Sequence, residues 1–211
     1  SKIIEAQIET GQPYMLYKDA INEKSNQKNI GVIKSSNLCA EIVEYSDKNQ
    51  TAVCNLASIA LPKFVDTKNK QYDYKKLYET AKLATKNLDR VIDINFYPTD
   101  KADTSNNLHR PIGLGIQGLS DVFFKLSIPH DGEEAAKINK LIFETIYFGA
   151  LEASMELAKE KGAYSSFQGS PLSEGKFQFD LWNIEPIKEV DGLQLDWDTL
   201  RYNIMNDGIY N

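Results

Sequence analysis

The sequence predicts a chain of mixed α/β class, with one extended segment and two long helices as its clearest elements. Residues 31–43 alternate polar and apolar positions, which indicates an extended segment with a loop inside it. Residues 74–94 carry apolar side chains at helical spacing. Residues 133–161 form a longer, mostly apolar pattern that Gly162 ends, which indicates a helix buried on several sides.

Shorter elements follow from local signals. Gly11 and Pro13 come after the apolar positions Ile4 and Ile8, and we expect them to end a first helix over residues 1–10. The remaining predicted elements are a Pro- and Asn-containing loop between 95 and 117, a helix over 118–126, a loop-rich stretch over 163–190 and a helix over 197–205.

Composition narrows the classes of function. The 211 residues carry a formal net charge of −6, which argues against a nucleic-acid groove, because binding phosphates needs clustered Lys and Arg. No apolar run approaches the roughly 20 residues of a membrane span, and no basic segment followed by an apolar one opens the chain, so we expect a cytoplasmic protein. The two cysteines, Cys39 and Cys54, are too few for a disulfide framework and lack metal-ligand spacing. They are therefore expected to act as thiols.

Both ends interrupt a pattern. Ile3, Ile4 and Ile8 open the chain in the middle of an apolar pattern, and the other end stops at a turn followed by apolar residues. We expect residues 1–211 to be a partial domain of a longer protein.

Three residues of the extended segment combine distinct chemistries. On a strand, Asn37, Cys39 and Glu41 would share one face, because successive side chains point to opposite faces. The amide donates and accepts hydrogen bonds, the thiol is a nucleophile or hydrogen-atom donor, and the carboxylate accepts a proton. A half-buried strand with an inert cysteine shows the same alternation, so spacing alone leaves both interpretations open.

A wider set of motifs resembles one family. SNLCAEI at residues 36–42 resembles the finger-loop motif of class I ribonucleotide reductase large subunits. The similarity covers most of residues 1–185, in an order like that of the eukaryotic-type enzyme, and its other motifs are ETGQPYMLYKD at 9–19, AVCNLAS at 52–58, HRPIG at 109–113, FETIY at 143–147, GALEAS at 149–154 and GSP at 169–171. The resemblance implies part of a ten-stranded α/β barrel with the finger loop threaded through its centre.

The resemblance also implies a role for each motif residue. Cys39 would become a thiyl radical that abstracts the 3′ hydrogen of the ribose of a ribonucleoside diphosphate, Glu41 would take the proton of the 3′-hydroxyl, and Asn37 would hold the neighbouring hydroxyl groups. Leu38 would belong to the substrate-binding loop. Cys54 would be one half of the redox-active disulfide, whose partner lies upstream of this chain.

Partners and cofactors are implied in the same way. The resemblance implies a large-subunit homodimer, a separate metal-containing small subunit that supplies the radical, thioredoxin or glutaredoxin as reductant, and ATP and dNTP effectors that bind elsewhere in the full subunit. No metal ligand and no cofactor are expected in this chain, which should be inactive alone. The sequence leaves open the base selectivity, the activity control by ATP and dATP, and the role of residues 187–211.

Two alternatives were weighed against this interpretation. A non-catalytic remnant or scaffold domain would keep the fold without needing Cys39, Glu41 or Cys54. A cobalamin-dependent or glycyl-radical relative would also use a barrel-centred cysteine, but the match outside the motif favours class I.

One motif is expected to be misleading. Residues 113–118 have the glycine spacing of a dinucleotide-binding loop, but His109, Arg110 and Pro111 precede them where that loop needs a strand. We expect these glycines to allow close backbone packing at a strand-to-helix turn, and His109 is given no catalytic role.

Overall fold

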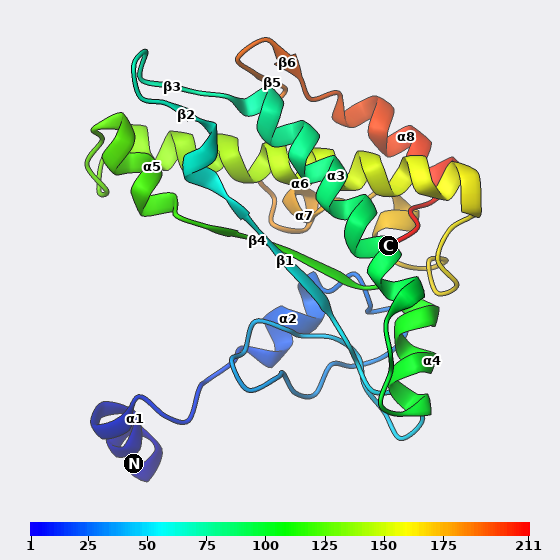
Figure 1. Ribbon diagram of the computed structural model, residues 1–211. Coiled ribbons are helices and arrows are strands. Elements are labelled where there is room, and N and C mark those ends of the chain that lie inside the picture. The colour runs from blue at the N-terminus through cyan, green and yellow to red at the C-terminus, as the bar shows by residue number, and fades with distance from the viewer.

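The computed structural model describes residues 1–211 and shows long helices packed beside a small parallel sheet (Figure 1). The helices are α1 Lys2–Thr10, α2 Lys18–Lys24, α3 Tyr74–Ile94, α4 Asp100–His109, α5 Leu119–Leu126, α6 Glu133–Lys161, α7 Gln178–Leu181 and α8 Trp197–Asp207. The strands are β1 Asn55–Ala60, β2 Val65–Asp66, β3 Gln71–Tyr72, β4 Ile112–Gln117, β5 Glu189–Val190 and β6 Leu193–Gln194.

Strands β1 and β4 form a parallel pair, with Asn55 opposite Ile112 and Ala60 opposite Gln117. Parallel neighbours need a long crossover, and here the crossover contains α3 and α4. The two other ladders, β2 with β3 and β5 with β6, are short antiparallel pairs. The predicted α/β class is thereby confirmed.

The core lies where α3 crosses α6, with α5 and α8 beside them (Figure 1). Leu77 and Ile142 are fully buried at its centre. Gly149 lets the helices approach closely, because a Cβ there would lie 3.0 Å from the carbonyl oxygen of Tyr78. Trp197 closes the far side, stacked edge-on against Phe148. None of the helices is both long and apolar enough to cross a membrane.

Most predicted helices are confirmed. Those over 74–94 and 133–161 have the expected bounds, and the expected helices over 1–10, 118–126 and 197–205 correspond to α1, α5 and α8. The buried face of α6 is broad, as its all-round apolar pattern predicted.

Two expectations differ from the structure. Residues 31–43 contain the expected loop as a turn at residues 38–40, but the segment forms no strand, because its backbone bonds go to the side chain of Asn22 on α2 and to the turn instead of to a ladder. The expected loop between 95 and 117 contains α4 and β4. Helix α4 has few apolar residues, yet Thr99 caps it by accepting a hydrogen bond from the N–H of Ala102, and Asp100 suits the positive end of its dipole.

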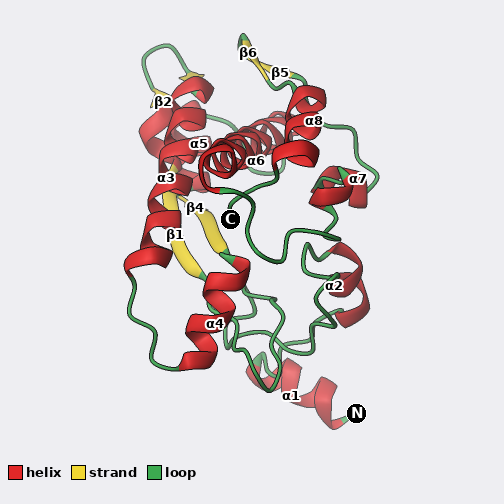
Figure 2. Cartoon of the chain, turned by 90° about the vertical axis from the view of Figure 1, so that its right-hand side faces the viewer, coloured by secondary structure: helices red, strands yellow, loops and turns green.

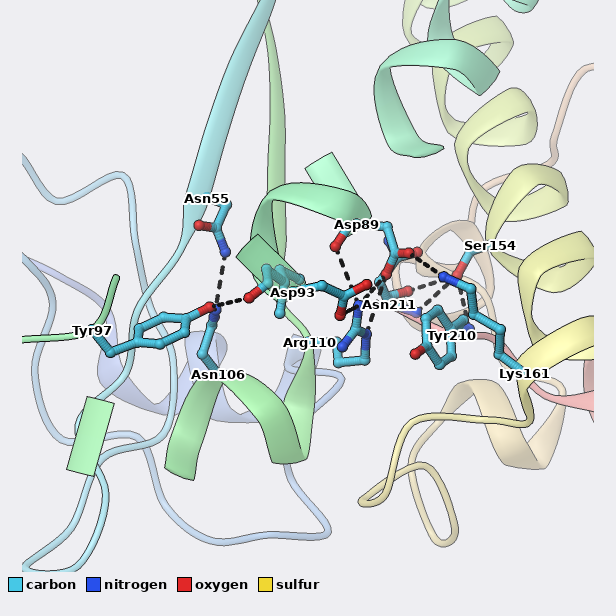
Figure 3. Close-up of polar contacts among 11 residues, drawn as sticks. Asn55, Asp89, Asp93, Tyr97, Asn106, Arg110, Ser154, Lys161, Tyr210 and Asn211 are labelled. Carbon is cyan, nitrogen blue, oxygen red and sulfur yellow. Dashed lines mark hydrogen bonds and ion pairs between the residues drawn. The ribbon is translucent and has the colours of Figure 1, made fainter. Parts of the chain in front are cut away.

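Arg110 is buried where α4 ends and β4 begins (Figure 3). Its backbone is left-handed, with φ 46°, and its guanidinium lies 2.6 Å from Asp89 and 2.8 Å from Asp93, both on α3. The side chain stacks over the ring of Tyr210, 4.2 Å from its centroid. Lys161, at the end of α6, reaches the other oxygen of Asp89 at 3.1 Å. This cluster joins α3, β4, α6 and the last residues of the chain.

A second buried network fixes the start of β1 (Figure 3). The amide of Asn55 donates to Asn106 of α4 over 3.4 Å, and Asn106 in turn donates to the hydroxyl of Tyr97. Tyr97 donates to the carbonyl of Ile92 over 2.7 Å. Because Asn106 is completely buried, these bonds replace water and determine how α4 sits against β1.

Removing the buried cation should destabilise the domain. We expect Arg110→Leu to lower the free energy of unfolding by about 3–5 kcal/mol, because it leaves Asp89 buried beside a single lysine. Chemical denaturation followed by tryptophan fluorescence measures this loss. Arg90→Leu is the matched control, since Arg90 is exposed on α3 next to Asp89. Its replacement should cost no more than about 0.5 kcal/mol. Equal losses in the two variants would show that the cluster contributes no special stability.

Candidate active site

The segment with Asn37, Cys39 and Glu41 is a tight turn instead of a strand. The N–H of Asn37 donates to the carbonyl of Ile42 over 3.3 Å, and the N–H of Ala40 donates to the carbonyl of Asn37 over 3.2 Å. Ala40 has a left-handed backbone, with φ 68°. The expected strand alternation is therefore wrong, since the three candidates project from one reversal of the chain.

The three side chains of the turn differ in what they contact. The side-chain oxygen of Asn37 accepts the N–H of Ile42 over 3.0 Å, so its amide both closes the turn and keeps its own N–H groups free. Cys39 and Glu41 are exposed, and Leu38 at the tip is 90% exposed. The turn thus leaves an amide, a thiol and a carboxylate accessible to solvent within five residues of the chain. These groups can donate and accept hydrogen bonds to hydroxyl groups.

Helix α2 and the polar residues after it hold both limbs of this turn. Asn22 accepts the N–H of Ile33 over 2.7 Å and donates to its carbonyl over 3.0 Å. Gln27 accepts the N–H of Tyr45 over 2.7 Å on the returning limb. The segment between α2 and β1 lies at the end of the sheet away from α5 (Figure 1, Figure 2). Side-chain bonds therefore position a turn that belongs to no sheet.

Cys54 is the last residue before β1, and its environment differs from that of Cys39. It is partly buried, and its sulfur lies 4.0 Å from the carbonyl oxygen of Asn55. Burial, together with the negative charge of Glu44 and Glu41, raises the pKa of the Cys54 thiol to about 12. Cys54 is therefore held as a neutral thiol, close enough to Glu41 to be affected by its charge.

Glycines in β4 leave room for this thiol. A Cβ on Gly113 would lie 3.0 Å from the sulfur of Cys54 and 2.4 Å from a methyl carbon of Leu56. Gly118 has φ 80°, and a Cβ there would lie 2.7 Å from the ring of Pro62, at the turn from β4 into α5. The expectation of close packing at a strand-to-helix turn is confirmed. Gly113 and Gly115 lie within the strand itself, unlike the loop of a dinucleotide site.

A cavity of about 570 Å³ opens beside the two strands. Its apolar side is formed by β4 and α6, including Leu114 and Ile146, and its polar lining includes Glu44 and His109. His109 contacts Ser166 and Gln50 through its two ring nitrogens, each at 2.6 Å, and burial lowers its pKa. Both nitrogens are occupied, so His109 ties two loops together.

Glu44 is the functional candidate that the sequence reasoning missed. Its carboxyl group is half-buried beside Cys54, and burial raises its pKa to about 7. A sequence signal existed in the turn-forming residues 47–50, because a reversal there brings residue 44 back towards residue 54.

The chain is similar to known proteins over its whole length. The family model described as "Ribonucleotide reductase, barrel domain" matches residues 1–211. The chain is 55% identical over 209 residues to the ribonucleoside-diphosphate reductase large subunit of Plasmodium falciparum, covering 99% of this chain and 25% of that protein. It is 55% identical over 213 residues to large chain 2 of Saccharomyces cerevisiae, covering 99% and 24%, and 54% identical over 209 residues to the large subunit of Caenorhabditis elegans, covering 99% and 26%.

The mixed α/β architecture built around β1 and β4 is consistent with part of such a barrel domain. The chain belongs to the ribonucleotide reductase barrel-domain family. It spans about a quarter of the length of the curated relatives that it matches.

Filling the space over Gly113 should disturb Cys54. We expect Gly113→Ala to cost about 1–3 kcal/mol of unfolding free energy, because the new methyl group must displace Leu56 and press on the sulfur. Thermal unfolding and the rate of Cys54 alkylation, followed by mass spectrometry, measure the two effects. Gly115→Ala is the control, since its nearest neighbour would be at an ordinary 3.5 Å. The close-packing explanation fails if both variants behave alike.

Proposed function

We propose that this chain supplies the radical-cysteine loop and part of the barrel in the catalytic large subunit of a ribonucleoside-diphosphate reductase. That enzyme reduces ribonucleoside diphosphates to 2′-deoxyribonucleoside diphosphates, the precursors of DNA. The observation that carries the proposal is the exposed turn that contains Asn37, Cys39 and Glu41, in a chain about 55% identical to proteins named as such large subunits.

Each residue of the turn has one step in the proposed reaction. Cys39, as a thiyl radical, takes the hydrogen from C3′ of the ribose and later returns one, and its exposed position gives a substrate access to the sulfur. Glu41 accepts the proton of the 3′-hydroxyl. Asn37 binds the neighbouring hydroxyls through the N–H groups that its own turn leaves free. The 2′-hydroxyl then leaves as water.

Cys54 supplies reducing equivalents in this proposal. It forms a disulfide with a second cysteine of the complete subunit as the ketone intermediate is reduced, and thioredoxin or glutaredoxin reopens that disulfide by thiol–disulfide exchange. Its neutral thiol fits this role, because the thiol must carry a hydrogen to the intermediate.

The remaining parts of the enzyme lie outside this chain. We propose a metal-containing small subunit as the source of the radical, a large-subunit homodimer, binding of ATP and dNTP effectors elsewhere in the subunit, and a cytoplasmic location. This chain needs no metal or cofactor of its own for the steps assigned to its residues.

Replacing the radical cysteine tests the proposal directly. In the complete subunit with its small subunit, Cys39→Ser should abolish deoxynucleotide formation while substrate binding survives, because the O–H bond of serine is too strong for the radical step. Product formation measured by chromatography, with nucleotide binding as the control, gives the result. Retained turnover would refute the assignment of Cys39 as the radical cysteine and favour a scaffold role for the chain.

Cys54→Ser should affect cycling. We expect it to block repeated turnover with thioredoxin or glutaredoxin, because the disulfide can no longer form and be reopened. Comparing product per subunit over many cycles in the variant and the unmodified subunit measures this. Normal cycling in the variant would refute the redox role of Cys54.

A further inference from the structure

A reversal of the chain places Glu44 opposite Cys54. The N–H of Asp47 donates to the carbonyl of Gln50 over 2.9 Å, and the carboxylate of Asp47 accepts the N–H of Asn49 over 2.8 Å. The N–H of Ala52 donates to the hydroxyl of Ser46 over 2.9 Å. The segments on either side of this turn therefore run antiparallel, and two residues further along each segment lie Glu44 and Cys54.

Glu44 and Cys54 are neighbours on the two sides of this turn. The carboxyl group of Glu44 lies close enough to the thiol of Cys54 for each group to shift the pKa of the other. Gly113 lies against the sulfur on the other side, so the thiol is held between β4 and the carboxyl group. Glu44 itself lines the cavity of about 570 Å³, which gives its carboxyl group a path to water.

No cation neutralises this carboxyl group. The other ionisable side chains that line the cavity are Lys24, His109, Tyr147 and Tyr164. Lys24 donates to the carbonyl of Leu181, and burial lowers the pKa of His109 and so favours its neutral form. Glu41 adds a second negative charge near the sulfur. Burial without a cation raises the pKa of Glu44 to about 7, so the carboxyl group exchanges a proton near neutral pH.

We propose that Glu44 is the general acid that protonates the sulfur of Cys54 when its disulfide is reopened by a dithiol, and the base that takes the proton back when the disulfide forms. This inference rests on the proposed redox role of Cys54.

The step balances with a dithiol as the only added reactant. One thiolate of the dithiol attacks the partner sulfur, a new S–S bond forms there, and the Cys54 sulfur leaves with the electron pair of the broken S–S bond. The Glu44 carboxylic acid gives its proton to that sulfur and becomes a carboxylate. The second thiol of the dithiol then displaces the partner cysteine, so the reductant ends as a disulfide and two electrons have moved to the protein. Glu44 regains a proton from water in the cavity.

The test compares Glu44→Gln with the unmodified complete subunit. The disulfide is formed with diamide and reopened with dithiothreitol at a constant thiolate concentration between pH 6 and 8.5, so that ionisation of the reductant does not contribute. Alkylation and mass spectrometry of the Cys54 peptide follow the rate. The unmodified protein should lose rate as pH rises through about 7, because its acid becomes a carboxylate. Glu44→Gln should be roughly tenfold slower at pH 6 and show no such fall. At pH 8.5 it should be at least as fast as the unmodified protein, because the Glu44 carboxylate no longer donates a proton there and disfavours the leaving thiolate.

A second measurement separates proton transfer from a structural role. Removing the negative charge should lower the pKa of the Cys54 thiol, so reduced Glu44→Gln should be alkylated faster at Cys54 at pH 8. Glu44→Asp should restore the pH dependence. Asp47→Asn is the matched control, because it removes the charge of an exposed carboxyl group of the same turn but keeps the side-chain oxygen that accepts the N–H of Asn49, and it should leave both readouts unchanged.

The outcomes distinguish this inference from the proposed function. A fall in rate through pH 7 that persists in Glu44→Gln overturns the role of Glu44, and so does an unchanged alkylation rate. If Cys54→Ser cycles normally, the redox role of Cys54 fails and this inference fails with it. If Cys54→Ser blocks cycling but Glu44→Gln behaves like the unmodified protein, the role of Glu44 is refuted and the redox role of Cys54 stands.

Discussion

The buried ion pair between Arg110 and Asp89 is the constraint on which the arrangement around the thiol depends. It ties the junction between α4 and β4 to α3, the helix that packs against both strands of the sheet. The register of β4 on β1 follows, with Gly113 opposite Leu56. In this register a residue without a side chain lies against the sulfur of Cys54. The charge pair at the start of β4 therefore helps to determine how much space the thiol has.

The turn that carries Cys39 is held in a different way from the core. The limbs are fixed by side-chain bonds from Asn22 and Gln27, and the tip leaves Leu38 almost fully in solvent. A segment with few buried apolar contacts opens at low free-energy cost, whereas α3 and α6 have the densest packing. The turn is therefore expected to open at a lower free-energy cost than the helices that pack in the core.

The sequence predicted the helices better than the site because periodicity reports burial of a face. Helices α3 and α6 bury apolar stripes, so their bounds could be read directly. Helix α4 buries Ser105 and Asn106 instead, and a polar buried face has no apolar period to detect. The candidate residues Asn37, Cys39 and Glu41 came from a motif, while their shared turn depends on backbone bonds that alternation does not describe. Glu44 was missed because its position opposite Cys54 arises from a chain reversal over the nine residues between them.

The environments of the two cysteines fit the different roles proposed for them. Cys39 is exposed on a turn, where its sulfur is accessible to a substrate, and Cys54 is partly buried between β4 and two carboxyl groups. Carboxyl groups beside a thiol disfavour its thiolate, which protects Cys54 from unwanted nucleophilic reactions but makes it a poor leaving group from a disulfide. An acid that can donate near neutral pH removes this obstacle. The same burial that keeps the thiol neutral also raises the pKa of Glu44, so one environment produces both the difficulty and the group that solves it.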